Sequence, residues 1–326
     1  MKRKFTKLKL DKNNIRICSY NILAPSVSEN NNLHKISCKG NCIKWAYRFD
    51  LIKKEINELN PDIICFQEAQ TEKAHNDILK YFRSKDYYGF YIPQYHTRKG
   101  AIKTEDDNFG IIILYSLKKF ICTEISSINY PQLVEKYIKD LSSNLQERAR
   151  GKRYCGLCLG LIDRETSNKI YVCSVHLEAF KNFEDVKNLQ AYITLKFLSK
   201  ISDNNKIPVI LCGDFNSIPS SSVYNGITKG ISLNKFDIKD NPETIKTPKI
   251  FTDQKYKSTF YEIYKKEPDF TNYTLKFKNT LDYIFVNSHF KIVDALDEIK
   301  EKLGLSIPNK NYPSDHIVIC ADLHLR

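Results

Sequence analysis

Residues 207–219, IPVILCGDFNSIP, join a buried strand to a polar turn, and the architecture of the chain follows from that junction. Residues 207–211 form a short β-branched, apolar run that predicts a strand. The next residues, Gly213-Asp214-Phe215-Asn216, place a carboxylate and an amide directly after it. Such groups at a strand end suit chemistry on a phosphate, although a turn with a capping side chain has the same sequence. Other strand ends must decide between these interpretations.

Four further polar segments lie at the ends of predicted strands: Ser19-Tyr20-Asn21, Gln67-Glu68, Ser174-Val175-His176 and Ser314-Asp315-His316. Each segment alone could be a turn with a capping side chain. A protein without an active site there, however, would seldom end five apolar runs in this way. Together they predict an active site. Their acid, amide and imidazole groups suit an oxygen-liking divalent ion, and the absence of cysteine favours Mg²⁺, or Mn²⁺, over zinc. We expect one or two ions.

The apolar runs predict strands over residues 15–23, 62–66, 109–115, 120–128, 155–162, 170–175, 207–211, 281–286 and 317–323. A helical stripe of apolar residues runs from Trp45 to Leu59 before Pro61 ends it, and a second helix is predicted over residues 183–198. The polar residues 163–169 predict an antiparallel hairpin. We therefore predict an α/β (α+β) fold of two sheets packed face to face, with helices outside each.

The composition fits one large domain. The chain has 326 residues, of which 42% are hydrophobic, and we predict a basic N-terminal extension over residues 1–14 and a single catalytic domain over residues 15–326. The polar residues 236–249 are interpreted as a surface loop. A net charge of +13 favours a polyanionic partner, nucleic acid before a membrane surface.

The chain lacks targeting signals of the common kinds. The opening MKRKFTKLKL has no apolar run of the length a secretory signal needs, and no stretch approaches the roughly 20 apolar residues of a membrane span. We predict a soluble cytoplasmic protein that does not enter the membrane, with the nucleus or, through a weak transit peptide, the mitochondrion as alternatives.

Most of the ten cysteines lie in or beside strand-like runs and are interpreted as reduced core residues: Cys18, Cys65, Cys122, Cys155, Cys158, Cys173, Cys212 and Cys320. Cys38 and Cys42, with His34, form the one loop cluster that could hold zinc, but the sequence offers no fourth ligand.

The ordered motifs resemble those of the endonuclease/exonuclease/phosphatase superfamily, whose fold is a four-layer α-β-β-α sandwich like deoxyribonuclease I. A closer resemblance, over residues 15–325, is to the catalytic domain of carbon-catabolite-repressor deadenylases and their nocturnin and angel relatives. It is carried by residues 19–23 (SYNIL), 45–55 (WAYRFDLIKKE), 62–68 (DIICFQE), 212–219 (CGDFNSIP), 267–285 (EPDFTNYTLKFKNTLDYIF) and 312–317 (YPSDHI).

The resemblance implies a role for each motif residue. Glu68 is the expected principal metal ligand, with Asn21 and Asp315 completing inner or water-mediated coordination. Asp214 is expected to orient or deprotonate the attacking water, and Asn216 to hold a phosphate oxygen or that water.

Two histidines are expected to stabilise the transition state. His176 and His316 would donate hydrogen bonds to the phosphoryl oxygens as negative charge develops there. Asp282 would fix the ring orientation of His316.

The substrate pocket carries a departure from the family pattern. The resemblance places Phe277 where deadenylases stack an adenine base, with Asn272 nearby. Lys181, however, stands where many deadenylases have a proline that sandwiches the base, so adenine selectivity stays open. Lys181 would equally suit a phosphate.

We predict a Mg²⁺-dependent 3′-5′ exoribonuclease that acts on single-stranded RNA such as poly(A) and releases 5′ nucleotides. The alternatives are a nocturnin-like phosphatase of nucleotides or dinucleotides, a 2′-5′ phosphodiesterase, and a non-catalytic RNA-binding module. The sequence contains no leucine-rich repeat for docking into a larger complex, and it identifies no protein partner.

Overall fold

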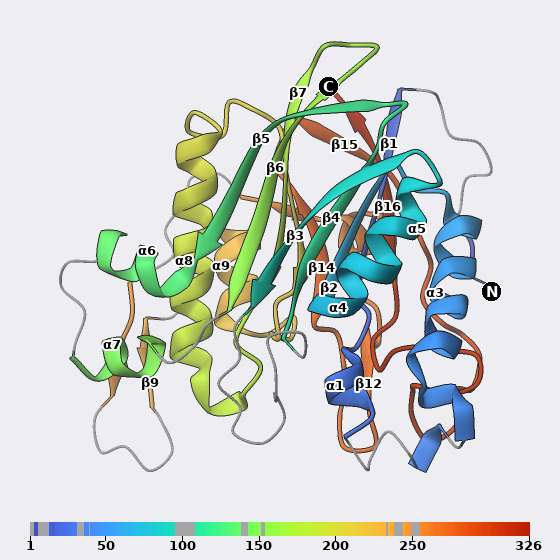
Figure 1. Ribbon diagram of the computed structural model, residues 1–326. Coiled ribbons are helices and arrows are strands. Elements are labelled where there is room, and N and C mark those ends of the chain that lie inside the picture. The colour runs from blue at the N-terminus through green and yellow to red at the C-terminus, as the bar shows by residue number, and fades with distance from the viewer. Residues whose placement is uncertain are drawn as a thin grey trace.

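The structure is a computed structural model that describes residues 3–5, 13–30, 36–38, 40–94, 108–137, 143–150, 154–232, 234–237, 244–248 and 255–326. Two six-stranded sheets form its centre (Figure 1). The first has the order β15 (Phe290–Ala295), β16 (Ile319–Leu325), β1 (Asn14–Asn21), β2 (Ile63–Gln70), β4 (Phe109–Ser116) and β3 (Tyr87–Gln94). The second has the order β11 (Lys257–Ser258), β14 (Asp282–Val286), β8 (Val209–Asp214), β7 (Lys169–His176), β6 (Cys155–Asp163) and β5 (Phe120–Asn129).

Three hydrophobic clusters define four layers. One lies between the sheets and joins side chains such as Ile17 and Ile113 of the first to Leu159 and Ile210 of the second. A second packs the first sheet against α3 (Trp45–Leu59), η2 (Ala74–Leu79) and α5 (Lys80–Arg83). A third packs the second sheet against α6 (Tyr130–Tyr137), α7 (Ser143–Arg150), α8 (Glu184–Ile201) and α9 (Ser222–Lys229). Figure 1 shows α3 and α8 on opposite outer faces, so the predicted α-β-β-α sandwich is confirmed.

Short elements connect these layers: α1 (Pro25–Ser28), η1 (Gly40–Ile43), α4 (Thr71–Lys73), η4 (Lys181–Phe183), β9 (Lys235–Phe236), β10 (Ile245–Lys246), α10 (Thr259–Tyr264), β12 (Asn272–Tyr273) and β13 (Lys278–Asn279). The long helix α3 ends as its sequence predicts, because Asn60 adopts a left-handed conformation (φ 47°) directly before Pro61.

Two parallel pairs lie near the middle of the sheets and are surrounded by antiparallel strands. β1 runs parallel to β2, and β7 runs parallel to β8. The carboxyl ends of β1, β2, β7 and β8 carry Asn21, Glu68, His176 and Asp214, so this arrangement gathers the polar strand ends.

Most predicted strands and both predicted helices are present. The predicted hairpin of residues 155–175 is antiparallel, with Leu159 opposite Val172. Two of the longer strands were missed, β3 and β15, together with the two-residue strands β9, β10, β11, β12 and β13. β3 contains Pro93, which central strands exclude, but β3 lies at the edge of its sheet, where a missing N–H is tolerated.

The interpretation of residues 236–249 as a surface loop is wrong in part. Phe236 of β9 pairs with Ile245 of β10, and both side chains are buried. Ile245 belongs to the cluster beneath α8, because an isolated apolar residue in a polar stretch still buries its surface. Residues 238–243 and 249 lie outside the described part.

Residues near the N-terminus contact the domain. Arg3 donates hydrogen bonds to the carbonyl oxygens of Asp297 (2.8 Å) and Val318 (2.6 Å), and Phe5 packs against the α3 cluster. Residues 6–12 lie outside the described part, so the division into an extension and a domain stays a prediction. No helix among the described residues has the length and hydropathy of a membrane span.

The zinc interpretation of the loop cysteines is wrong here. Cys38 and Cys42 form a disulfide, so neither offers a thiolate, and His34 lies outside the described residues. The eight cysteines predicted to be reduced are free thiols, and all except the half-buried Cys122 are buried.

Candidate active site

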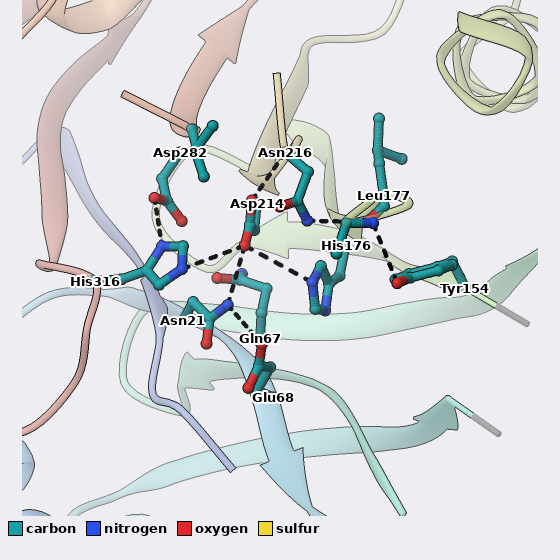
Figure 2. A network of polar contacts seen from close by, with 12 residues as sticks. Asn21, Gln67, Glu68, Tyr154, His176, Leu177, Asp214, Asn216, Asp282 and His316 are labelled. Atoms are coloured by element: carbon teal, nitrogen blue, oxygen red, sulfur yellow. Dashed lines mark hydrogen bonds and ion pairs between the residues drawn. The ribbon is translucent and has the colours of Figure 1, made fainter. Parts of the chain in front are cut away.

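The predicted catalytic residues converge at one edge of the two sheets (Figure 2). Strand pairing places His176 and Asp282 on either side of Asp214 in the second sheet. In the first sheet, Asn21 lies beside Gln67, the neighbour of Glu68. The site therefore forms where strand ends of both sheets meet.

A bulge in β2 positions Glu68. The pairing of β2 with β4 shifts register between Phe66 and Ala69, and Glu68 adopts a left-handed φ of 56°. Bulges redirect a side chain locally, and strained backbone of this kind gathers at functional sites. The Glu68 carboxylate accepts hydrogen bonds from the Asn21 amide (3.2 Å) and the Ala24 backbone N–H (3.2 Å).

Asp214 is the centre of the network. Its Oδ2 accepts a hydrogen bond from Asn21 Nδ2 (3.0 Å) and lies 3.7 Å from His176 Nε2 and 3.6 Å from His316 Nε2. Its Oδ1 accepts the backbone N–H of Asn216 (2.9 Å). Burial and the nearby Asp282 raise the pKa of Asp214 despite both histidines, which makes it a stronger base toward a bound water.

Gly213, directly before Asp214 in β8, lies very close to the backbone of β7. Gly213 has a φ of 132°, and a Cβ there would lie 2.0 Å from the Val175 carbonyl oxygen. Only glycine fits this conformation and this contact. The glycine of the GDFN motif therefore lets Asp214 approach His176.

His316 is oriented by Asp282. The His316 Nδ1 contacts Asp282 Oδ2 at 2.8 Å, and the Thr271 hydroxyl donates to the same oxygen at 2.6 Å. Burial lowers the pKa of His316, but the Asp282 and Asp214 carboxylates outweigh it and raise that pKa well above its ordinary value. The expected pairing of Asp282 with His316 is present, and Thr271 is an additional member that the sequence did not indicate.

Aromatic rings hold His176. Phe109 stacks on its ring at a centroid distance of 6.3 Å, and Tyr154 meets it edge-on at 5.5 Å. These contacts leave Nε2 directed toward Asp214 (Figure 2). His176 can therefore present this nitrogen to a group bound beside Asp214.

Buried polar side chains join the two halves of the site. The Gln67 amide donates to the hydroxyls of Ser19 (3.1 Å) in the first sheet and Ser174 (2.9 Å) in the second. The Ser314 hydroxyl donates to the Asn21 carbonyl (2.7 Å) and accepts the His316 N–H (3.1 Å). The sequence placed these residues beside catalytic ones but gave no sign of their bonds.

Arg48 of α3 is a second residue that the sequence did not single out. It is fully buried, and its guanidinium donates to carbonyl oxygens of Ile22 (2.8 Å), Leu23 (2.8 Å) and Pro313 (3.0 Å). Further bonds reach the Ile43 carbonyl and the Ser28 hydroxyl. Arg48 thus links the loop after Asn21 to the loop before Asp315.

A cleft of about 630 Å³ opens onto this centre. It is lined by nine of the predicted site residues: Glu68, His176, Lys181, Asp214, Asn216, Asn272, Phe277, Asp315 and His316. Asn21 and Asp282 do not line the cleft but bond to residues that do. At one wall, Lys181 Nζ lies 5.4 Å from the centroid of the Phe277 ring. The structure thus brings the predicted site together, while the role of each residue stays a prediction.

The donor set fits a divalent cation. Among the described residues, the tight group of possible ligand atoms, within 4.8 Å of one another, is Asp214, Asp282 and His316. It differs from the predicted ligands, and two of its members already bond to each other. The Glu68 and Asp315 carboxylates line the cleft, and oxygen ligands of this kind suit Mg²⁺ or Mn²⁺. We therefore place the ion at Glu68 and Asp315 as an expectation, where it would stabilise charge on a bound phosphate.

Proteins of known sequence are similar to this chain over most of its length. The profile of the Endonuclease/Exonuclease/phosphatase family matches residues 18–316. The CCR4-Not complex 3′-5′-exoribonuclease subunit Ccr4 of Schizosaccharomyces pombe is 29% identical over 316 residues, which cover 87% of this chain and 45% of that protein. A probable Ccr4 subunit of Vairimorpha ceranae is 30% identical over 291 residues, 86% of this chain and 58% of that protein. The chain thus spans about half the length of these relatives.

Solved structures share the fold. ANGEL2, described as a 2′,3′-cyclic phosphatase in complex with adenosine-2′,3′-vanadate, superimposes with a TM-score of 0.82 at 22% identity, over 100% of this chain and 99% of that one. The human Nocturnin catalytic domain gives 0.71 at 23% identity, over 99% and 98%. The chain therefore belongs to the endonuclease/exonuclease/phosphatase family, in the branch of the Ccr4, nocturnin and angel proteins.

Proposed function

We propose that this protein is a Mg²⁺-dependent 3′-5′ exoribonuclease that removes nucleotides from poly(A)-like single-stranded RNA. The observation that carries the proposal is one cleft that joins the Asp214, His316 and Glu68 groups to the half-buried ring of Phe277. A phosphodiester at the first end and a base stacked at the second would fit a terminal nucleotide. The Ccr4 relatives and the net charge of +13 support an RNA substrate.

The residues divide the chemistry. Asp214, with its raised pKa, would accept a proton from the attacking water. His176 and His316 direct their Nε2 atoms to the same carboxylate from two sides, where they would donate to the phosphoryl oxygens. Mg²⁺ at Glu68 and Asp315 would supply positive charge to the transition state.

A second candidate is a phosphatase that acts on nucleotides or dinucleotides, or a 2′-5′ phosphodiesterase. The ammonium of Lys181 lies over the Phe277 ring, where the deadenylase pattern has a proline, and it could bind a further phosphate. The similarity of the fold to ANGEL2 and Nocturnin is compatible with this candidate but shows the fold alone.

The purified chain with Mg²⁺ and 5′-labelled oligo(A) tests the proposal. We expect stepwise shortening from the 3′ end, release of 5′-AMP, and loss of both in Glu68→Ala. A parallel reaction with free dinucleotide phosphates measures phosphate release. Intact oligo(A) beside rapid phosphate release would replace the first candidate by the second, and no activity on either would favour a non-catalytic RNA-binding module.

The cytoplasm is the proposed location, because the Ccr4 relatives act on RNA as exoribonucleases by name and an RNA tail is the proposed substrate. Imaging of the tagged chain in cells would test this, and a nuclear or mitochondrial signal would overturn it.

A further inference from the structure

The first turn of α8 places a buried lysine against the wall of the catalytic cleft. The Lys187 side chain is 3% exposed, and its ammonium contacts the Glu184 carboxylate at 2.7 Å, whereas the Glu184 side chain is 40% exposed. Both residues line the cleft that contains Asp214 and Phe277. The proposed reaction assigns no task to either of them.

The neighbours of Lys187 on α8 have structural partners. Asp185 is held by both arms of Arg148 at 2.7 and 2.8 Å. Asn188 donates to Thr247 and accepts from the Ser222 hydroxyl. These bonds tie α8 to the elements around it. Lys187 is different, because its partner within the described residues lies on the same helical turn and tethers no other element.

An ammonium group has three donors, and the bond to Glu184 uses one of them. Burying a charge is unfavourable unless it is fully paired. A structural role would be served equally well by an apolar residue of similar length. Among the residues that the structure describes, the other two donors have no partner, and their position beside a substrate cleft indicates that a ligand completes the shell of Lys187.

The Glu184–Lys187 pair indicates which kind of ligand would bind. An ammonium donor next to a carboxylate acceptor complements a group that presents an acceptor beside a donor. The hydroxyls of a ribose have this pattern, and carboxylates commonly bind them. So does adenine, whose N6 amino group lies beside ring-nitrogen acceptors. An additional phosphate does not fit, because the Glu184 carboxylate would repel it.

We propose that Glu184 and Lys187 form a specificity site for the uncharged donor–acceptor edge of the terminal nucleoside. The inference rests on the proposed function, since it requires a nucleotide in the cleft. Either the sugar hydroxyls or the edge of the base could present this donor–acceptor pattern to Glu184 and Lys187. If the pair binds the sugar hydroxyls, it favours a nucleoside with a free 3′ end over one with a terminal phosphate, which Glu184 would repel.

Binding of AMP to the purified chain with Mg²⁺, measured by calorimetry, tests the site without turnover. We expect Glu184→Gln and Lys187→Met each to weaken AMP binding about tenfold, which corresponds to about 1.4 kcal/mol. The matched control is the pair Asp203 and Lys206, which has the same spacing and a 2.9 Å contact but side chains 64% and 73% exposed. Asp203→Asn and Lys206→Met should bind AMP as the native chain does.

Two analogues distinguish the sources. Weakened binding of 2′-deoxy-AMP to the native chain, with no further loss in the variants, assigns the pair to the sugar. The same pattern with inosine monophosphate, which lacks the amino group, assigns it to the base. If the pair binds the sugar, adenosine 3′,5′-bisphosphate should bind more weakly than AMP to the native chain, and Glu184→Gln should reduce that difference.

The inference is overturned if both variants, shown to be folded by thermal unfolding, bind AMP like the native chain, or if the control variants lose as much. Failure of the proposed function looks different. A native chain that leaves oligo(A) intact but binds AMP in a pair-dependent way would refute the exoribonuclease and keep this site.

Discussion

Replacement of Arg48 by lysine should loosen the proposed metal site, although Arg48 is not one of its proposed ligands. The native guanidinium makes five hydrogen bonds of 2.8 to 3.2 Å, four to carbonyl oxygens and one to the Ser28 hydroxyl. Lysine has three donors, so at least two acceptors lose their partner. An unpaired buried acceptor costs about 1–3 kcal/mol, and the free energy of unfolding should therefore fall by roughly 2–6 kcal/mol.

The effect on the site follows from where the bonds end. Burial lowers the pKa of Arg48 to about 10, with Asp315 acting against this, so the group stays charged at neutral pH. Its carbonyl partners flank Ala24, whose N–H holds the Glu68 carboxylate, and Ser314, which precedes Asp315. Displaced supporting groups typically weaken metal binding about 10–100-fold. We expect a change of that size in the Mg²⁺ dissociation constant.

The measurement combines urea unfolding of the metal-free chain with a Mg²⁺ titration followed by calorimetry. Arg16→Lys is the matched control, because Arg16 binds both oxygens of Asp322 and the Leu59 carbonyl, and none of these groups lines the cleft. It should lower stability and leave Mg²⁺ affinity unchanged. If Arg48→Lys binds Mg²⁺ like the native chain, or if Arg16→Lys loses as much affinity, the proposed support of Glu68 and Asp315 is wrong.

Three further changes test other parts of the molecule. Burial raises the pKa of Glu55 from its ordinary value of 4.5 to about 7, although Arg3 and Tyr20 oppose it. The native state therefore prefers the protonated Glu55, and its contribution to the free energy of unfolding should fall by roughly 3 kcal/mol as pH rises from about 4.5 to about 7. Glu55→Gln should remove this pH dependence in unfolding measurements across that range. An unchanged pH dependence in the variant would contradict the assignment to Glu55. Asp282→Asn should lower kcat by roughly 10²–10⁴-fold in oligo(A) assays, because His316 loses the carboxylate that orients it. Thermal unfolding should show that the variant is folded. An unchanged kcat would exclude the Asp282–His316 pair from the reaction. Lys181→Pro should raise the preference for oligo(A) over oligo(U) by about tenfold, within the roughly 1–3 kcal/mol of base stacking, and equal cleavage of both by this variant would separate Lys181 from base selection.

The sequence predicted which residues lie together at the cleft, because they belong to short motifs at strand ends, and their roles stay predictions. Asp214 and Glu68 follow apolar runs directly, and the fold brings such ends together. The layers were also predictable, since period-two and period-3.6 patterns report which faces are buried. These features depend on local sequence.

The supporting residues were not predictable, because their roles arise from contacts between distant segments. Arg48 bonds to Pro313, 265 residues away, and nothing in a helical stripe distinguishes a buried arginine from a solvated one. Lys187 likewise has the spacing of an ordinary helical ion pair. Thr271 gains its meaning only when β14 brings Asp282 to it.

The pairing of β1 with β16 has a consequence for synthesis of the protein. β1 lies inside the first sheet, yet one of its two partners, β16, begins at Ile319, about 300 residues later. During translation β1 must wait for that strand, and pairings over such separations form slowly. His316 and Asp315 arrive with it, so a growing chain has no complete catalytic centre. A catalytic centre built on these residues can therefore assemble only after β16 has been synthesised and has paired with β1.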